Sequence, residues 1–285
     1  MSLWMAHDAG VTVGPTCNHE AVNGTRSQLG RWRPMTRAQV PAFLRRALRI
    51  ARTEIAALTA LLVIAAGVMT FVELADDMTE EDGQAFDGAV LSALRPHADP
   101  SDAWGPWWLE EAAADLTSLG GIAVLGLFAT AVVVFLILQR KRLSALLLVV
   151  GLAGGVALSE GLKAVFERDR PPSVYQAVDT INASFPSGHA LLSAVFYLSI
   201  GVMLTRAFPR RHMKAYVLGI AILLTLLVGL TRVYLGAHWA TDVLACWSVG
   251  AAWAMVLWLV AYAVERRQIV HHAPLQDEPS PGEAA

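Results

Sequence analysis

Six long runs of uncharged, mostly apolar residues divide the chain. Each run contains 16 to 22 residues, and a helix needs roughly 17 to 25 residues to cross the hydrocarbon core of a bilayer. A helix of a soluble bundle keeps a polar face, whereas these runs have none. We therefore predict six membrane-spanning helices, at Ile55–Val72, Leu119–Leu138, Leu143–Ser159, Ala190–Thr205, Ala215–Thr231 and Val243–Val264.

The connection between the first two predicted spans is long and acidic. It covers Glu73–Ser118 and holds twelve acidic residues and one arginine. Apolar residues recur in it at helical spacing, which predicts a short amphipathic helix, including Asp87–Arg95, near the membrane interface. The residues of this apolar stripe are Phe86, Val90 and Leu94, and the tryptophans that follow, typical of interfacial anchors, are Trp104, Trp107 and Trp108.

The two ends of the chain are polar and irregular. We predict that residues 1–50 and 268–285 are largely disordered segments in the cytoplasm. They flank an all-α, six-helix membrane domain at residues 51–267. The first apolar run begins more than fifty residues from Met1, too late for a cleaved signal peptide, so we expect it to be retained as a helix.

The composition agrees with a membrane protein. Of the 285 residues, 55% are hydrophobic and 16% are charged, against roughly 45–50% and 25% in soluble domains. Cys17 lies in the N-terminal segment and Cys246 in the last predicted span. These positions indicate neither a disulfide framework nor a CxxC metal site.

The placement of the 22 lysines and arginines predicts the orientation of the spans. With the N-terminus in the cytoplasm, 17 of these residues lie on the cytoplasmic side and five on the outer side. Such an excess is the positive-inside pattern of membrane proteins. It predicts that both termini are cytoplasmic in an inner-membrane protein. The five outer cations are Arg95, Lys163, Arg168, Arg170 and Arg232.

Three polar patches fall on the outer face under this topology. One follows the third span, one opens the fourth and one joins the fifth to the sixth. The shared face suggests that the patches form one site. In order, they are Lys163 to Arg170 and Pro171, then Pro186-Ser187-Gly188-His189, then Arg232, His238 and Asp242.

The cations of these patches favour an anionic ligand. Arginine guanidinium groups match phosphate oxygens in a bidentate manner, and Lys163 adds a third positive charge to Arg170 and Arg232. Ser187 and Gly188 come at a helix start, where a hydroxyl and free backbone N–H groups favour phosphate binding.

Two histidines and one aspartate are candidates for the chemistry. His238 and Asp242 lie four residues apart, hence on one face if that turn is helical. Asp242 can then hold one imidazole nitrogen while the other attacks as a nucleophile. His189 is the candidate proton donor to the leaving oxygen. Arg168 and Arg95 we interpret as solvated or as lipid-headgroup contacts.

The three patches resemble the signature motifs of the type 2 phosphatidic acid phosphatase superfamily, which also includes vanadium haloperoxidases and glucose-6-phosphatase. The family pattern is Lys-x6-Arg-Pro, then Pro-Ser-Gly-His, then Ser-Arg-x5-His-x3-Asp. The sequence meets it in order, except that Thr231 replaces the serine before Arg232. The resemblance covers about residues 55–265.

This resemblance implies a six-helix core with an outward-facing site and a covalent phosphohistidine on His238. It implies that Asp242 orients this histidine and that His189 protonates the leaving group. It also implies that the phosphoryl oxygens bind to the residues at the remaining motif positions: Lys163, Arg170, Ser187, Gly188 and Arg232.

Other classes of function fit less well. A hydrolase with a metal on His189, His238 and Asp242 would place a divalent ion beside three cations. A transporter would carry ionisable groups near mid-membrane rather than at span ends. A haloperoxidase-like use of the anion site is disfavoured by the membrane spans, which suggest a lipid substrate.

We therefore predict a metal- and cofactor-independent phosphatase whose partners are a lipid phosphate and the bilayer, without nucleic acid. The preferred substrate is phosphatidic acid or a related phospholipid monoester, and the alternative is an isoprenyl (undecaprenyl) diphosphate. The sequence leaves the oligomeric state and the exact lipid open.

Overall fold

The computed structural model describes residues 42–78, 80–96, 99–178 and 183–271, with side chains from Glu54 to Arg267. The chain divides into two compact units, residues 1–49 and 50–285. Most of the two terminal segments predicted to be disordered, 1–50 and 268–285, lies outside the described residues, so the predicted domain boundaries stay predictions. The second unit contains the bundle of long helices.

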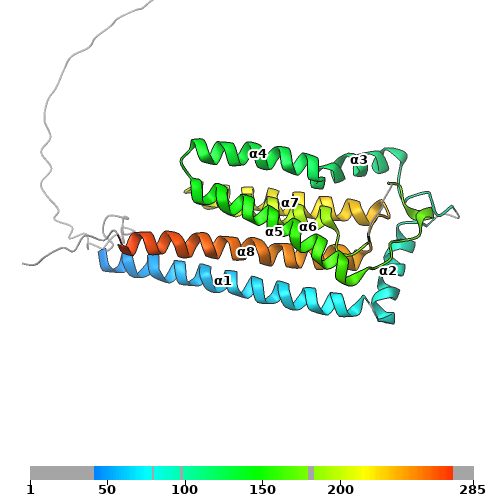
Figure 1. Cartoon of the computed structure of the whole chain (residues 1–285), viewed down its shortest axis with the longest axis horizontal. Coiled ribbons are helices and arrows are strands. Elements are labelled where there is room, and N and C mark those ends of the chain that lie inside the picture. The colour runs from blue at the N-terminus through cyan, green and yellow to red at the C-terminus, as the bar shows by residue number, and fades with distance from the viewer. Residues whose placement is uncertain (1–41, 79, 97–98, 179–182, 272–285) are drawn as a thin grey trace, which may run out of the picture. The chain divides into compact units, whose positions relative to one another are not determined.

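The described residues form helices and no strand, which confirms the predicted all-α fold. Each predicted span corresponds to one long helix of the bundle in Figure 1. These helices are α1 (Ala42–Asp77), α4 (Ile122–Leu138), α5 (Arg142–Phe166), α6 (Gly188–Ala207), α7 (Arg211–Tyr234) and α8 (Ala240–His271).

Five of these helices are long and apolar enough to cross a membrane within the described part of the chain. The second predicted span differs, because α4 continues α3 (Trp107–Thr117) and a short 3-10 turn across a bend of 48°. The bend occurs where Gly121 adopts an extended conformation. Next to it, a Cβ on Gly120 would overlap Val228 and approach the His189 carbonyl oxygen to 3.1 Å. The second predicted span is therefore a bent pair rather than a straight helix.

Helix α6 is the centre of the bundle. It packs against α4, α5, α7 and α8. Half of the apolar stretch of α6 is buried inside the protein, compared with 11% of the apolar stretch of α1. Small residues let the helices approach closely, as is usual where lipid gives no hydrophobic drive for association. A Cβ on Gly201 would lie 2.6 Å from that of Ala221 on α7, and a Cβ on Gly250 of α8 would lie 2.6 Å from that of Ala194.

Large apolar side chains cover the outside of the bundle. On α1, Leu58, Leu61 and Leu62 are each more than half exposed. In water such a surface would be costly, whereas in a bilayer it faces lipid tails. The exposed apolar surface and the long helices fit a multi-pass membrane protein.

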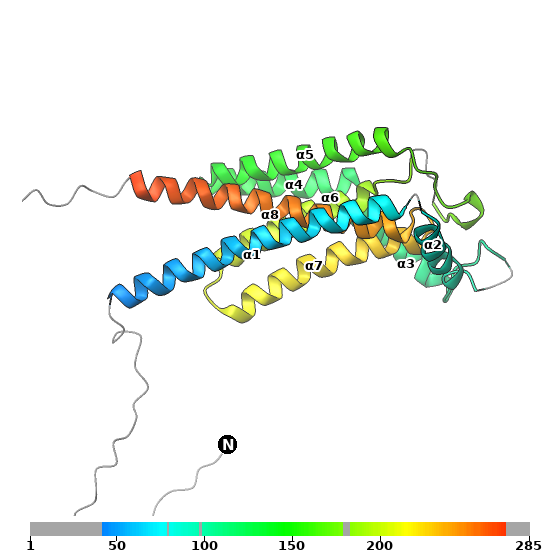
Figure 2. The ribbon, with the colours of Figure 1, turned by 90° about the horizontal axis from the view of Figure 1, so that it is seen from below.

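The predicted amphipathic helix is present as α2 (Glu81–Ala93). Its buried face is not the apolar stripe, however: Gly83, Asp87 and Leu91 are buried, whereas Phe86 is exposed. The stripe instead lines an apolar crevice of about 410 Å³ beside α7 and α8. Figures 1 and 2 show α2 at the end of the bundle where α1, α5 and α7 also end. The buried face of α2, toward the rest of the protein, therefore contains an aspartate, Asp87.

Candidate active site

The helix ends and connections that carry all eight sequence-predicted site residues lie at this same end of the bundle (Figure 1). Two of these residues lie in the last turn of a helix: Lys163 in α5 and Arg232 in α7. The others come from the loop after α5, from the start of α6, and from the turn that leads into α8. Because successive helices run in opposite directions, the C-terminal ends of α5 and α7 and the N-terminal ends of α6 and α8 meet at one end of the bundle, which brings the three motifs together.

The turn before α8 positions His238. Gly236 adopts a positive φ of 65°, and a Cβ there would overlap the carbonyl oxygen of Tyr175, so only glycine fits. The backbone N–H groups of Ala237 and His238 both donate to the carbonyl oxygen of Arg232, at 3.0 and 3.3 Å. His238 is therefore held close to the end of α7 and its cation.

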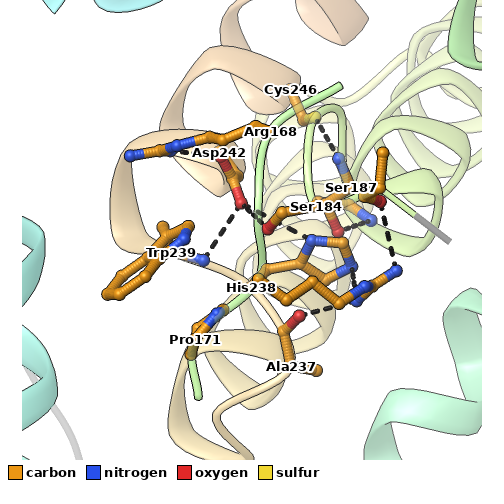
Figure 3. Close-up of polar contacts among 12 residues, drawn as sticks. Arg168, Pro171, Ser184, Ser187, Ala237, His238, Trp239, Asp242 and Cys246 are labelled. Carbon is orange, nitrogen blue, oxygen red and sulfur yellow. Dashed lines mark hydrogen bonds and ion pairs between the residues drawn. The ribbon is translucent and has the colours of Figure 1, made fainter. Parts of the chain in front are cut away.

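Asp242 lies in the first turn of α8, beside His238. Its Oδ2 is 3.6 Å from His238 Nδ1, and Figure 3 shows Asp242 joined to His238, Ser184 and Trp239. Oδ2 accepts the backbone N–H of Trp239 at 3.1 Å and the Ser184 hydroxyl at 2.5 Å. The predicted pairing is present, although α8 begins only at Ala240: Asp242 folds back on the preceding turn instead of sharing a helical face with His238.

His238 presents one nitrogen to the carboxylate and the other to a cation. Its Nε2 lies 3.3 Å from Nη1 of Arg170. A guanidinium only donates, so Nε2 must present its lone pair, and the proton of the neutral ring is on Nδ1, facing Asp242. Burial lowers the pKa of His238 to about 4, although Asp242 acts in the opposite direction. The imidazole is therefore neutral at pH 7, as a nucleophile must be.

Three cations surround this histidine and the start of α6. Arg170 donates to the carbonyl oxygens of Ala237 at 2.7 Å and Ala183 at 3.3 Å, and burial lowers its pKa. Arg232 is 6% exposed; its Nη1 donates to Thr117 Oγ1 at 3.4 Å, and its Nε finds no partner among the described residues. A guanidinium group with an unpaired N–H, as in Arg232, is suited to phosphoryl oxygens.

Lys163 is the third cation and the least buried. Its Nζ forms an ion pair with Glu160 at 2.9 Å, and the Glu160 side chain is 63% exposed. An ion pair open to water contributes roughly 0–1 kcal/mol. If a bound phosphate replaces Glu160 as the partner of Lys163, the loss of this ion pair therefore costs little free energy.

The start of α6 differs in one detail from the expected phosphate site. Ser187 caps the helix, its hydroxyl accepting from the backbone N–H of Ala190 at 3.5 Å. Its own N–H donates to the thiol of Cys246 at 3.1 Å, so it is not free for a ligand. The N–H groups of Gly188 and His189 remain, because the first turn of a helix offers them no backbone acceptor. Cys246 is buried and unpaired.

The structure contradicts the sequence interpretation of Arg168 and Arg95 as solvated or bound to lipid headgroups. Arg168 donates to Asp242 Oδ1 at 2.5 Å and to Asp87 Oδ2 at 2.7 Å, and it stacks over the ring of Trp239. Arg95 is 6% exposed, and its guanidinium donates to three backbone carbonyl groups, on Leu94, Tyr175 and Tyr234. Both therefore hold the site together. The position of Arg168 inside the first motif was the one available signal.

Comparison with known proteins agrees with this geometry. Residues 144–266 match the model of the PAP2 superfamily. Phosphatidylglycerophosphatase B of Bacillus subtilis is 34% identical over 148 residues, which are 50% of this chain and 70% of that protein. The chain belongs to the PAP2 superfamily. It is therefore a membrane phosphatase of the lipid phosphatase type, a phosphoric ester hydrolase.

Two further PAP2 relatives refine the picture. An undecaprenyl-diphosphatase of Sulfolobus acidocaldarius is 32% identical over 121 residues, 41% of this chain and 54% of that protein. The crystal structure of the first transmembrane PAP2 type phosphatidylglycerolphosphate phosphatase from Bacillus subtilis superposes with a TM-score of 0.65 at 28% identity. The superposition covers 71% of this chain and 98% of that one, which supports the fold over the part of the chain that superposes.

Within the residues that the structure describes, no three His, Cys, Asp or Glu side chains gather closely enough to hold a metal ion. The pocket instead collects cations around a neutral imidazole. Chemically, this arrangement can bind a phosphoryl group and attack it with nitrogen.

The depressed pKa of His238 gives a pH test. A histidine with an ordinary pKa of about 6.5 is mostly protonated at pH 5.5, whereas His238 should remain neutral because its folded-state pKa is about 4. Histidine-selective ¹⁵N NMR in detergent, with the His238→Gln spectrum for assignment, measures this directly. In denaturant the same signal should titrate near about 6.5. Titration near that value in the folded protein would contradict the proposed neutral state.

Proposed function

We propose that the protein hydrolyses a lipid phosphate through a covalent phosphohistidine on His238. The observation that carries this proposal is the placement of the His238 ring, with Nε2 facing Arg170 and Nδ1 facing the buried carboxylate of Asp242. An attacking nitrogen, its orienting group and an anion pocket are then in one place.

In the first step, Nε2 of His238 attacks phosphorus, and the bond from phosphorus to the lipid oxygen breaks. The proton on Nδ1 stays in place, so the ring becomes cationic and Asp242 stabilises it. Charge on the phosphoryl oxygens is offset by fixed donors. These are the cations Lys163, Arg170 and Arg232, the Ser187 hydroxyl and the N–H of Gly188.

His189 has two proton transfers to perform in this scheme. It gives a proton to the leaving lipid oxygen in the first step. In the second it takes a proton from a water molecule that attacks phosphorus, the P–N bond breaks, and inorganic phosphate leaves with His238 restored. His189 is in the first turn of α6, and its Nε2 would lie 3.8 Å from a Cβ on Gly121, next to the α3–α4 bend.

The substrate that we favour is phosphatidic acid or a related phospholipid monoester. Support comes from the phosphatidylglycerophosphatase of Bacillus subtilis, to which the chain is similar over 70% of that protein's length. An isoprenyl diphosphate such as undecaprenyl diphosphate is the second candidate, supported by the undecaprenyl-diphosphatase relative. Both present a phosphoryl group on an apolar anchor, which suits a pocket at the end of membrane helices.

We also propose that the pocket opens on the outer face of the inner membrane, with both termini cytoplasmic. The support is the 17-to-5 distribution of lysine and arginine. In the bundle, cations lie in the α4–α5 and α6–α7 connections, at Arg140, Lys141 and Arg210, and at the start of α7, at Arg211. They lie at the end opposite the site (Figure 2).

The orientation is tested by accessibility of single cysteines in intact cells. Ser173→Cys, at the pocket end, should react with a membrane-impermeant thiol reagent from outside. Pro209→Cys, in the α6–α7 connection, should react only after permeabilisation. A Cys17→Ser background suffices, because Cys246 is fully buried, and that parent is the unlabelled control. Outside labelling of Pro209→Cys alone would reverse the topology.

Metal independence and the nucleophile are tested together in purified protein. Since three cations would repel a divalent ion, EDTA should leave activity unchanged, whereas vanadate, a mimic of the five-coordinate phosphoryl group, should inhibit. His238→Ala should abolish turnover of every lipid. The assay uses a panel of phosphatidic acid, phosphatidylglycerophosphate and undecaprenyl diphosphate in detergent. Full activity of His238→Ala would reject the mechanism, and the panel ranks the two substrate classes.

The roles of the two histidines are separated by the leaving group. A lipid alkoxide needs protonation, so His189→Ala should lower its hydrolysis by about 10²–10⁴-fold. Nitrophenolate leaves unprotonated, so with p-nitrophenyl phosphate this variant should give a burst of nitrophenol and then stall as a phosphoenzyme. His238→Ala should give no burst. If His189→Ala shows neither burst nor trapped phosphate while still binding vanadate, the assigned division between the histidines is wrong.

A further inference from the structure

Arg168 bridges two buried carboxylates from distant parts of the chain. Its Nη1 donates to Asp242 at 2.5 Å, and its Nη2 donates to Asp87 at 2.7 Å. The Arg168 side chain is 14% exposed, and the two carboxylates are 0% and 1% exposed. Asp87 belongs to α2, between the first two spans, and so lies outside the residues 144–266 that match the family.

Asp87 also holds the first turn of α8. Its Oδ1 accepts the backbone N–H of Thr241 at 3.0 Å, and its Oδ2 accepts the Thr241 hydroxyl at 2.6 Å. That hydroxyl in turn accepts from Arg168 Nη1 at 2.9 Å. A carboxylate at a helix N-terminus is favoured by the unsatisfied N–H groups there. Asp87 thus fixes both the residue next to Asp242 and the arginine that binds it.

The charges of this cluster matter for His238. One guanidinium is shared between two carboxylates, so Asp242 is only partly neutralised and keeps negative charge toward His238 Nδ1. If Asp87 were neutral, Arg168 would serve Asp242 alone, and the cationic ring that forms during phosphoryl transfer would be stabilised less. Leaving a buried charge unpaired is strongly destabilising. The charged side chains of this network are therefore held in their paired positions.

We propose that Asp87 is a positioning residue for the hydrolytic reaction, acting on His238 through Arg168 and Asp242. This inference rests on the proposed function, since it presumes that His238 becomes cationic during turnover. It assigns α2 a part in the chemistry: the helix supplies the second carboxylate that sets how strongly Arg168 binds Asp242.

The test is a double-mutant cycle on the full-length protein in detergent, with p-nitrophenyl phosphate and phosphatidic acid as substrates. Asp87→Asn keeps the shape and one acceptor oxygen but removes the charge. It should lower kcat by about 10–100-fold, the range typical of partners that orient an active-site ligand. KM should change little, because the phosphate-binding cations are untouched. The control is Asp82→Asn, an exposed aspartate on the same helix, which should match the wild type.

Coupling to Arg168 distinguishes this role from a purely structural one. In an Arg168→Gln background, Asp87→Asn should have almost no further effect on kcat, because its route to Asp242 is already lost. Additive losses, a loss confined to KM, or equality of Asp87→Asn with the Asp82→Asn control would each overturn the proposal. If Asp87→Asn does not give monodisperse protein, Asp87→Ser, which also removes the charge and keeps an acceptor oxygen, replaces it in the same cycle, and an unchanged kcat overturns the proposal.

Failure of the proposed function itself has a different signature. It would be a wild-type protein that hydrolyses neither substrate although it is folded and binds vanadate. An active wild type with an indifferent Asp87 refutes only the positioning role.

Discussion

The buried carboxylate of Asp242 is the group on which the arrangement of the site depends. It is fully buried, and a charge in such a place persists only when hydrogen bonds and opposite charges surround it. Its partners come from separate segments: Arg168 and Ser184 from the connection between α5 and α6, and Trp239 from the turn before α8. Satisfying this one charge therefore pulls together the loops that carry the other site residues.

The helix bundle encloses the cluster around Asp242 and limits its exposure to solvent. Helix α6 is enclosed by its neighbours and starts at the proposed phosphate-binding segment, so Ser187 and Gly188 are held at the start of the most buried spanning helix. Glycines at helix contacts allow the close packing, as at Gly250 against Ala194. The same enclosure keeps His238 neutral, because burial disfavours the charged imidazole.

The site extends beyond the part of the chain that defines the family. The PAP2 match covers the last four spanning helices, which carry all three motifs. Helix α2, α3 and the connections around them add Asp87, Arg95 and Thr117, which contact Arg168, the backbone beside the site, and Arg232. These segments therefore take part in the packing around the site.

The sequence by itself determined the elements whose signal is local. Uncharged runs predicted the six spans, because a bilayer demands length and apolarity from each helix separately. Motif spacing predicted His189, His238, Asp242 and the cations as site residues, since the proposed chemistry needs those residue types whatever surrounds them. Tertiary structure decided the rest. Nothing near Asp87 marked it among the twelve acidic residues of that connection, because its partner Arg168 lies 81 residues away. Arg95 was misread for the same reason, and the bend at Gly120 depends on contacts with α6 and α7. The pairing of buried charges and the close packing of backbones join residues that are far apart in the sequence. Only the tertiary structure therefore determines them.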